Sequence, residues 1–193
     1  MKTVFVEIDT QLDFLFPSGA LYVPGAERRL DALRQLHHFS THHGHPLLST
    51  ADAHLEDDPE FKTWPHHCIA GTNGQRRPAE LLTRAPAVIP VTPLASQGLN
   101  SSQFIIEKRT LRFFSNPNTV DLLATLAPDR YVVYGVATEY CVGLGALDLL
   151  TTGSRVEIVT DAIEGIAAVD VEAMLARLTA GGAHLTTVAQ ICA

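Results

Sequence analysis

Four reactive side chains each follow a short apolar run of the sequence. In chain order, the runs and side chains are VFVEI (4–8) with Asp9, PLLST (46–50) with Asp52, QFIIE (103–107) with Lys108, and YVVYG (131–135) with Cys141. A thiol beside a carboxylate and an ammonium group can support nucleophilic catalysis, because the acid can take the thiol proton and the lysine can balance the charge. These four side chains are therefore candidates for one reactive site, provided that the fold brings them together.

Cys141 has two interpretations. It falls in the first turn of a helix predicted to begin near Thr138, where free N–H groups and the helix dipole favour a thiolate. A cysteine in an apolar strand–helix unit can also be a small core residue. Because Asp9 and Lys108 are expected at the same edge of the fold, we favour Cys141 as a nucleophile.

Metal-ligand types occur in the segment after the second run. Asp52-x-His54 and the later pair His66-His67 offer oxygen and nitrogen atoms but no thiolate. Three protein ligands with open positions are typical of a catalytic metal site. Only one of the adjacent residues His66 and His67 need be a ligand. The alternative interpretation of the Asp52-x-His54 pair is that both side chains lie in a solvated loop and bind no metal.

Two further groups are interpreted as structural. The first is a set of histidines at the end of a predicted helix, where we expect solvated side chains that suit the helix dipole: His37, His38, His42, His43 and His45. The second is Glu7, a charge inside a strand that we predict to be buried. By the alternation of a strand, Glu7 shares a face with Asp9, and we expect it to form an ion pair with an unnamed partner.

The elements that must position these groups alternate along the chain. Two more apolar runs, RVEIVT (155–160) and HLTTV (184–188), complete a set of strands that read as buried on both faces. Helices are predicted over 26–44, over 118–127 with a capping box from Asn118 to Asp121, over 138–153, and over 171–182 with Asp170 as N-cap.

This alternation predicts an α/β fold of three layers, α/β/α, around a mostly parallel, doubly wound, Rossmann-like sheet. The carboxyl ends of such strands gather at one edge, so Asp9, Asp52, Lys108 and Cys141 should converge there. The segment 51–100 is rich in Pro, Gly and His, and we expect a long loop that carries function.

The length and composition of the chain fit a single α/β domain over residues 1–193. Hydrophobic residues make up 46% of the chain and charged residues 18%, and the net charge of −7 comes without a basic run. We therefore expect neither a nucleic-acid partner nor a membrane partner, since no apolar stretch approaches the roughly 20 residues of a spanning helix. Three cysteines without a CxxC motif fit a reducing compartment, and we expect a cytoplasmic protein.

Four motifs carry a family resemblance over nearly the whole chain. They are IDTQLDF with GALYVPGA, TADAH with TWPHHC, FIIEKR, and GVATEYCV. Together they resemble the nicotinamidase/pyrazinamidase branch of the isochorismatase-like cysteine hydrolases. The resemblance implies a triad of Asp9, Lys108 and Cys141. It also implies one divalent ion, Zn or alternatively Mn or Fe, held by Asp52, His54 and His67.

The resemblance further implies a substrate pocket and a reaction. Phe14 and Trp64 would flank an aromatic ring beside Tyr140, and the Val136–Ala137 bond would be cis, with the N–H groups of Ala137 and Cys141 facing an oxyanion. The expected reaction is hydrolysis of nicotinamide, or a similar aromatic carboxamide, to the acid and ammonia through a cysteine thioester. We also expect a small-molecule amide as the only ligand besides the metal, and a homo-oligomer.

The residues after Lys108 leave an alternative open. Arg109 and the stretch TLRFFSNPNT resemble metal-free members of the same superfamily. The alternative enzyme would act on another small amide, a ureido compound or a vinyl ether. A catalytically silent relative that binds a metal or ligand is a third reading, which the presence of Asp9, Lys108 and Cys141 disfavours.

Overall fold

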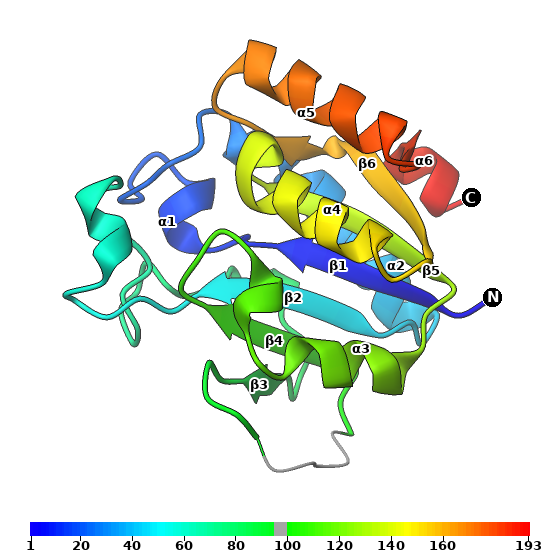
Figure 1. Cartoon of the computed structure of the whole chain (residues 1–193), viewed down its shortest axis with the longest axis horizontal. Coiled ribbons are helices and arrows are strands. Elements are labelled where there is room, and N and C mark those ends of the chain that lie inside the picture. The colour runs from blue at the N-terminus through cyan, green and yellow to red at the C-terminus, as the bar shows by residue number, and fades with distance from the viewer. Residues whose placement is uncertain (95–99) are drawn as a thin grey trace.

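A seven-stranded sheet runs through the computed structural model, which describes residues 1–94 and 100–193 (Figure 1). The strand order is β3-β4-β2-β1-β5-β6-β7, and every neighbouring pair is parallel. The strands are β1 (Thr3–Ile8), β2 (Leu47–Asp52), β3 (Ala87–Ile89), β4 (Gln103–Lys108), β5 (Arg130–Val136), β6 (Arg155–Glu164) and β7 (His184–Thr186). The predicted α/β fold with a parallel sheet is therefore confirmed.

Helices cover both faces of this sheet and complete three layers. In Figure 1, α3, α4 and α5 lie on the near face, and α2 and α6 lie on the far face. The helices are α1 (Leu12–Leu15), α2 (Leu30–His42), α3 (Thr119–Leu126), α4 (Gly143–Leu150), α5 (Ala168–Ala180) and α6 (Val188–Ile191). Short 3-10 turns η1 to η4 lie at Ala26–Arg29, Pro59–Lys62, Ala79–Leu81 and Phe113–Ser115, and a π-helical turn, η5, lies at Thr138–Val142.

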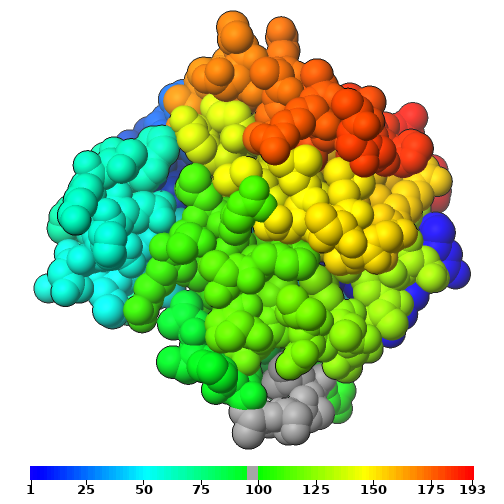
Figure 2. All heavy atoms as spheres, viewed as in Figure 1, coloured from blue at the N-terminus to red at the C-terminus, as the bar shows by residue number. Residues whose placement is uncertain are grey.

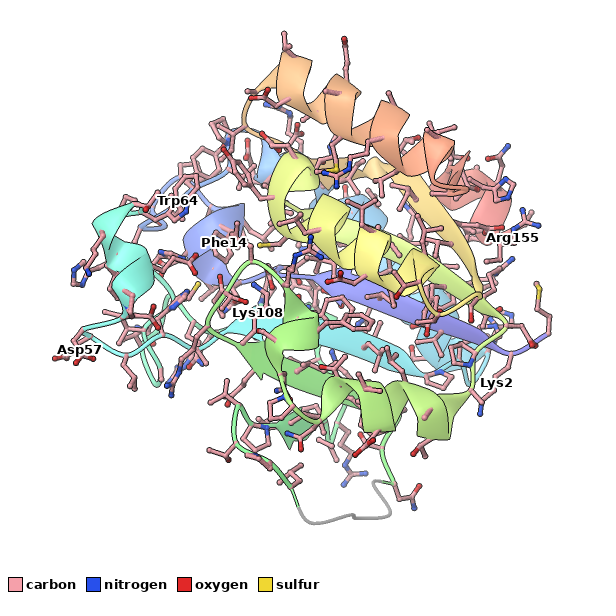
Figure 3. The ribbon with its side chains drawn as sticks, viewed as in Figure 1. Lys2, Phe14, Asp57, Trp64, Lys108 and Arg155 are labelled. Carbon is pink, nitrogen blue, oxygen red and sulfur yellow. The ribbon has the colours of Figure 1, made fainter. Side chains whose placement is uncertain are left out.

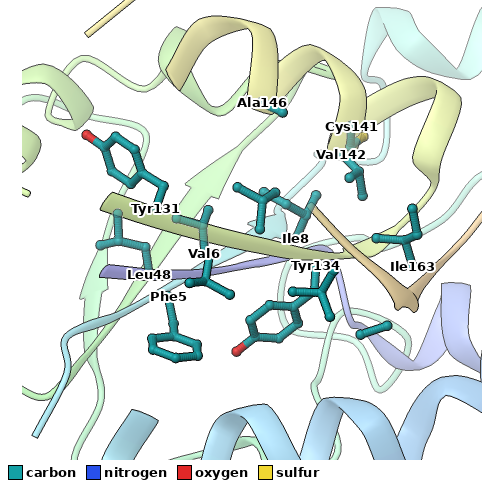
Figure 4. Packing of buried hydrophobic residues seen from close by; sticks show 14 of the residues in the cluster. Phe5, Val6, Ile8, Leu48, Tyr131, Tyr134, Cys141, Val142, Ala146 and Ile163 are labelled. Atoms are coloured by element: carbon teal, nitrogen blue, oxygen red, sulfur yellow. The ribbon is translucent and has the colours of Figure 1, made fainter. Parts of the chain in front are cut away.

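The core lies between the sheet and these two helical layers. Successive strand side chains point to opposite faces, so each central strand buries apolar groups on both sides. Figure 4 shows Ile8 and Tyr131 on the α4 side of the sheet, and Phe5 and Tyr134 on the α2 side. All four side chains are at most 1% exposed. This explains why the strand segments read as continuous apolar runs in the sequence.

Three sequence-based boundaries are wrong for identifiable reasons. Helix α5 begins at Ala168, so Asp170 lies in its first turn rather than at the N-cap. No side chain caps α5 among the described residues, but the N–H groups of Ile166 and Ala167 donate to Glu139 Oε1 at 2.7 and 2.9 Å, so a side chain from another element fixes the chain just before the helix begins.

The predicted capping box of α3 is absent, because Asn118 makes no side-chain cap. Its amide instead donates to the carbonyls of Pro90 and Thr92, and its Oδ1 accepts from Leu94 N. The segment 51–100 contains the edge strand β3, which the sequence analysis missed. Residues 95–99 of that segment lie outside the described part of the chain.

The helix predicted from Thr138 divides into two elements. The π-helical turn η5 spans Thr138–Val142 and changes direction at Tyr140, and regular α-helix starts only at Gly143. Cys141 therefore precedes the N-terminus of α4 instead of lying in its first turn. It projects from the turn that leads from β5 into α4, above the buried apolar layer (Figure 4).

The carboxyl ends of β1, β2, β4 and β5 meet at one end of the molecule. Figure 3 shows Phe14, Trp64 and Lys108 toward this end and Lys2 and Arg155 at the opposite end. In the sheet, β2 lies on one side of β1 and β5 lies on the other, so the strand order reverses direction at β1. Open parallel sheets bind ligands in the crevice that forms at such a point, beyond the carboxyl ends of the strands. In the space-filling view, the segment after β2 forms the cyan edge of the molecule, beside the green segment that follows β4 (Figure 2).

Close contact between β1 and β5 shapes this crevice. Gly135 has a φ of 121°, and a Cβ built there would lie 2.1 Å from the carbonyl oxygen of Ile8. Only glycine fits this combination of backbone angle and space. The peptide bond between Val136 and Ala137, which follows directly, is cis, as the family resemblance implied.

Among the helices of the described residues, none combines the length and apolar character needed to cross a membrane.

Candidate active site

Lys108 forms the centre of a buried cluster at the carboxyl end of β4. Its Nζ lies 2.8 Å from Asp9 Oδ2 and donates to Asp52 Oδ1 at 2.5 Å. The same Nζ donates to Cys141 Sγ at 3.6 Å. Burial would lower the pKa of Lys108, but the two carboxylates outweigh burial and raise it well above its ordinary value. Lys108 is therefore a fixed cation that joins the ends of four strands.

Asp9 is held in place by its own backbone and by Thr50. It adopts the left-handed conformation, with a φ of 48°, which aspartate tolerates better than most residues. Its N–H donates to Thr50 Oγ1 at 3.1 Å, and the Thr50 hydroxyl donates to Asp9 Oδ1 at 2.6 Å. Because the left-handed residue breaks the alternation of β1, Asp9 is directed at Lys108 while Glu7 faces a different set of partners.

Cys141 lies 7% exposed beside Lys108 and Asp9. Burial raises the pKa of its thiol above the ordinary value, Lys108 opposes this, and the carboxylates of Asp9 and Asp52 add to the rise. This differs from the sequence-based expectation of a thiolate stabilised by a helix N-terminus. A thiol that keeps its proton needs a base to become a nucleophile, and Asp9 is the neighbouring group that can serve.

Asp52, His54 and His67 form a compact group of metal-ligand type. One ligand atom from each lies within 4.8 Å of the others, and all three side chains are buried. The Nε2 atoms of His54 and His67 are each 3.7 Å from Asp52 Oδ2. Burial would raise the pKa of Asp52, but Lys108 and the two histidines outweigh burial and lower it, so the carboxylate is ionised.

The residues of this group fit a divalent ion such as Zn²⁺. Ligand atoms about 2.0–2.2 Å from a tetrahedral zinc are roughly 3.4 Å apart, close to the 3.7 Å that separates Asp52 Oδ2 from the Nε2 atom of each histidine. Both ring nitrogens of His54 are buried without a hydrogen-bond partner among the described residues, and Nε2, which faces Asp52, is available to bind an ion. His67 Nδ1 lies 2.7 Å from the carbonyl oxygen of Pro65, and His54 Nδ1 lies 3.1 Å from Asp58 Oδ2. Such outer contacts orient metal-ligating imidazoles.

His66 does not join this group. Its side chain is exposed, and its ring stacks on Phe61 with centroids 4.2 Å apart. The helix-end histidines also lie away from it. His38, His42 and His43 are exposed, as expected, whereas the expectation is wrong for His37, which is buried 3.8 Å from Glu7 Oε2.

Glu7 forms the ion pair that the sequence predicted without a partner. Its Oε1 lies 2.5 Å from an Nη2 atom of Arg77, in the segment between β2 and β3. Burial would raise the pKa of Glu7, but Arg77, His37 and Thr10 outweigh burial and lower it. Glu7 is not among the residues that line the pocket described next.

An apolar pocket of about 400 Å³, counting its open mouth, adjoins the Lys108 cluster and the metal-ligand group. The five substrate-contacting residues expected from the resemblance all line it, namely Phe14, Trp64, Val136, Ala137 and Tyr140. The rings of Trp64 and Tyr140 meet edge to face at 5.2 Å, and Phe14 lies 5.4 Å from the ring of His67. Asp9, Asp52, His67 and Cys141 also face this space, so the pocket borders both the Lys108 cluster and the metal-ligand group.

Sequence reasoning missed several residues that support the site. Glu60 lines the pocket, and burial together with Asp52 raises its pKa. Asp58 caps the turn η2 by accepting from Glu60 N, and its other oxygen faces His54. The Asp58-Pro59-Glu60 sequence is a helix-start signal that could have identified this turn.

Gln11 holds the backbone of Asp52 in place by hydrogen bonds. Its Oε1 accepts from Asp52 N at 2.7 Å, and its Nε2 donates to Asp52 O at 2.9 Å and to Gln75 O at 2.8 Å. No periodic pattern in the sequence could reveal a bond between residues 41 positions apart.

Comparisons with known proteins agree with this architecture. The isochorismatase domain family matches residues 3–190. The nicotinamidase of Escherichia coli (strain K12) is 25% identical over 208 residues, which cover 94% of this chain and 93% of that protein. The nicotinamidase/pyrazinamidase of Mycobacterium tuberculosis (strain H37Rv) is 24% identical over 168 residues, which cover 83% of this chain and 86% of that protein.

Two solved structures share the fold over nearly the full chain. The pyrazinamidase of Pyrococcus horikoshii in complex with zinc has a TM-score of 0.81 at 26% identity, covering 97% of this chain and 99% of that one. PnC1 from L. infantum in complex with nicotinate has a TM-score of 0.81 at 25% identity, covering 97% and 93%.

The parallel sheet with a cysteine, a lysine and an aspartate at its carboxyl edge defines, together with these matches, a hydrolase with an α/β fold. The chain belongs to the isochorismatase family. Its resemblance within that family is to the nicotinamidase branch, as the sequence motifs predicted.

Proposed function

We propose that this chain is a metal-assisted amidase that hydrolyses nicotinamide, or a similar aromatic carboxamide, to the acid and ammonia. The observation that carries the proposal is the meeting of Cys141, Lys108 and Asp9 beside an aromatic pocket that also contains Asp52 and His67. The nicotinamidase relatives support the same substrate class.

The reaction follows from the contacts of the cluster. Asp9 takes the thiol proton of Cys141, and the sulfur attacks the amide carbon to form a tetrahedral intermediate. The N–H groups of Ala137 and Cys141 are the proposed donors to its oxyanion. Asp9 then gives the proton to the departing ammonia and leaves a thioester. Water, deprotonated by Asp9, cleaves the thioester and releases the acid and the thiol.

Lys108 keeps the charges of this cluster balanced during the cycle. It contacts Asp9 and Cys141 together, so it stabilises negative charge on whichever of them lacks the proton. When bound, the divalent ion held by Asp52, His54 and His67 would offer an open coordination position to a ring nitrogen.

The charge of the pocket favours a neutral substrate. Asp9, Asp52 and Glu60 line it, and no arginine or lysine is among the lining residues that the structure describes. A substrate carboxylate would find no cationic side chain there, which disfavours an anionic vinyl ether or ureido acid. A neutral carboxamide on an apolar ring suits Phe14 and Trp64 better.

A substrate pair tests the proposal. Nicotinamide and benzamide share the ring shape and the amide, but benzamide lacks the ring nitrogen. We expect benzamide to be turned over at least about 100-fold more slowly, because lost positioning costs orders of magnitude in rate. Chelation should slow nicotinamide hydrolysis and leave the benzamide rate nearly unchanged. Ammonia release at equal rates from both amides would favour the metal-free alternative.

Metal analysis tests the ligand set independently of activity. We expect one divalent ion per chain, lost in His54→Ala and His67→Ala because two ligands hold an ion weakly. His66→Ala is the matched control and should keep the metal, since His66 lies exposed on Phe61. Loss of metal from the His66 variant and its retention by the His67 variant would reverse this assignment.

A further inference from the structure

The main-chain ladder between β1 and β2 ends before it reaches the active site. Its last registered pair is Glu7 with Ser49. Asp9 and Asp52 both lie beyond that pair. In the described residues, the hydrogen bonds that cross this gap involve side chains, including those of Thr50 with Asp9 and of Gln11 with Asp52.

Arg77, which is not among the residues that line the pocket, crosses the same gap. Its Nη1 donates to the main-chain carbonyl of Thr50 at 2.9 Å, and its Nη2 donates to Thr10 Oγ1 at 2.5 Å. Thr10 follows Asp9 directly, and Thr50 carries the hydroxyl that binds Asp9 Oδ1. One guanidinium group therefore ties together the two chain segments that hold Asp9.

Glu7 holds Arg77 in this position. The two side chains lie 2.5 Å apart, Glu7 is fully buried and Arg77 is 7% exposed. The Thr10 hydroxyl also donates to Glu7 Oε1. Both Nη atoms of Arg77 are bonded, to Thr50, Thr10 and Glu7, whereas its Nε is buried without a partner among the described residues. The contacts of the two Nη atoms hold the planar guanidinium in one orientation.

We propose that Arg77, anchored by Glu7, is a positioning residue that sets the orientation of Asp9 for proton transfer with Cys141. The proposal rests on the proposed function only in assigning Asp9 as the base. Arg77 does not line the pocket, so it acts on the reacting groups through Thr10 and Thr50. Displacing a catalytic group by about 1 Å can cost on the order of 100-fold in rate without changing substrate contacts.

Arg77→Lys is the decisive variant, because lysine keeps the charge beside Glu7 but cannot span Thr10 and Thr50 as a fork. We expect kcat for nicotinamide to fall at least tenfold while KM stays within threefold. Alkylation of Cys141 at neutral pH, measured in a Cys192→Ala background, should become more than twofold faster, because a displaced Asp9 carboxylate no longer helps to raise the pKa of the thiol. Arg130→Lys is the matched control: its ion pair with Glu157 lies at the start of β5, at the far end of the sheet, and kcat should stay within twofold.

A double-mutant cycle separates positioning from general stability. Thr50→Val removes the hydroxyl that binds Asp9. If Thr50 and Arg77 both act by positioning Asp9, the fall in kcat of the double variant should be smaller than the product of the two single falls. If Arg77→Lys fails to fold, Glu7→Asp replaces it, because the shortened side chain draws away from Arg77. This variant should also lower kcat more than KM.

Three results would overturn the proposal: kcat and alkylation within twofold of wild type, equal effects of the Arg77 and Arg130 variants, or fully multiplicative losses in the cycle. The alkylation rate needs no substrate. If the wild-type protein releases no ammonia from any aromatic carboxamide, the proposed function fails, while faster alkylation in Arg77→Lys still supports the positioning role.

Discussion

At the scale of single residues, the site depends on Lys108, which contacts several charged or reactive groups at once. Lys108 contacts two carboxylates and a thiol although it is 1% exposed. A lone buried ammonium group would lose its proton, but the neighbouring carboxylates raise the pKa of Lys108, and Lys108 in turn lowers the pKa of Asp52. Lys108 and Asp52 therefore each keep their charge because the other is present.

The nucleophile is tested by removing one atom. Cys141→Ala should abolish ammonia release while the melting temperature changes little, because the covalent route disappears and only a small edge side chain is lost. Cys192→Ala is the control and should keep most of the activity. Cys68→Ala should too, although Cys68 is fully buried next to His67 and its loss should cost more stability. Turnover of Cys141→Ala within tenfold of wild type would exclude the thioester route.

The base is tested by an isosteric change. Asp9→Asn keeps the shape of the side chain but cannot accept the thiol proton, so activity should fall at least about 1000-fold. The Asp9 carboxylate also contributes to the raised pKa of Cys141, so the neutral Asn should leave more thiolate beside Lys108, and alkylation at neutral pH should become faster while turnover is lost. Unchanged alkylation together with unchanged ammonia release would show that Asp9 is only a strand-end residue.

At the scale of elements, strands were easier to predict than the boundaries of helices. The central strands are buried on both faces, so their composition alone identifies them. The edge strand β3 has only three residues, and its Val88 is 53% exposed, so no apolar run marks it. The start of α5 depends on Glu139, which is distant in sequence, and the turn at Cys141 depends on the route from β5 into α4. Local patterns carry no signal for either.

Glycine at position 135 is required by the packing of β5 on β1. Gly135→Ala combines a forbidden φ with a clash against Ile8 O, and should lower the free energy of unfolding by at least about 3 kcal/mol. Gly153→Ala is the matched control, because Gly153 also has a positive φ, 81°, but a Cβ built there would have no atom within 4 Å. It should cost only about 1 kcal/mol. Equal losses in urea denaturation would show that the contact with Ile8 does not matter.

At the scale of the whole molecule, one sheet brings together groups from both halves of the chain. The convergence of Asp9, Asp52, Lys108 and Cys141 followed from the strand assignments, since parallel strands present their carboxyl ends at one edge. What the sequence could not reveal are the side-chain bonds made after folding. Arg77 lies 70 positions from Glu7, in a segment with no periodic pattern, and its contact depends on where the loop after β2 packs.

The buried pair of Glu7 and Arg77 should make stability depend on pH. The pKa of Glu7 is lower in the folded protein than in the unfolded chain. Its ionised carboxylate therefore adds to the free energy of unfolding at pH values above the unfolded pKa of about 4.3, and this stabilisation is lost as the pH falls through the folded pKa. Glu7→Gln should unfold about 3 kcal/mol more easily at pH 7, and its curve should converge with that of wild type in acid. Glu172→Gln, on the exposed face of α5, should follow wild type throughout. Parallel curves for wild type and Glu7→Gln below about pH 4.5 would contradict this account.

The gap beyond the last β1–β2 pair has an evolutionary consequence. Hydrogen bonds between main chains are the same whatever the sequence, but bonds made by Gln11, Thr50 and Arg77 change with a single codon. The positions of the Asp9 and Asp52 carboxylates can therefore change by mutation while the sheet that supports them stays the same. Mutation at these three positions can adjust the reactive centre while the scaffold is conserved, which makes them the natural targets for libraries that seek new substrates on this fold.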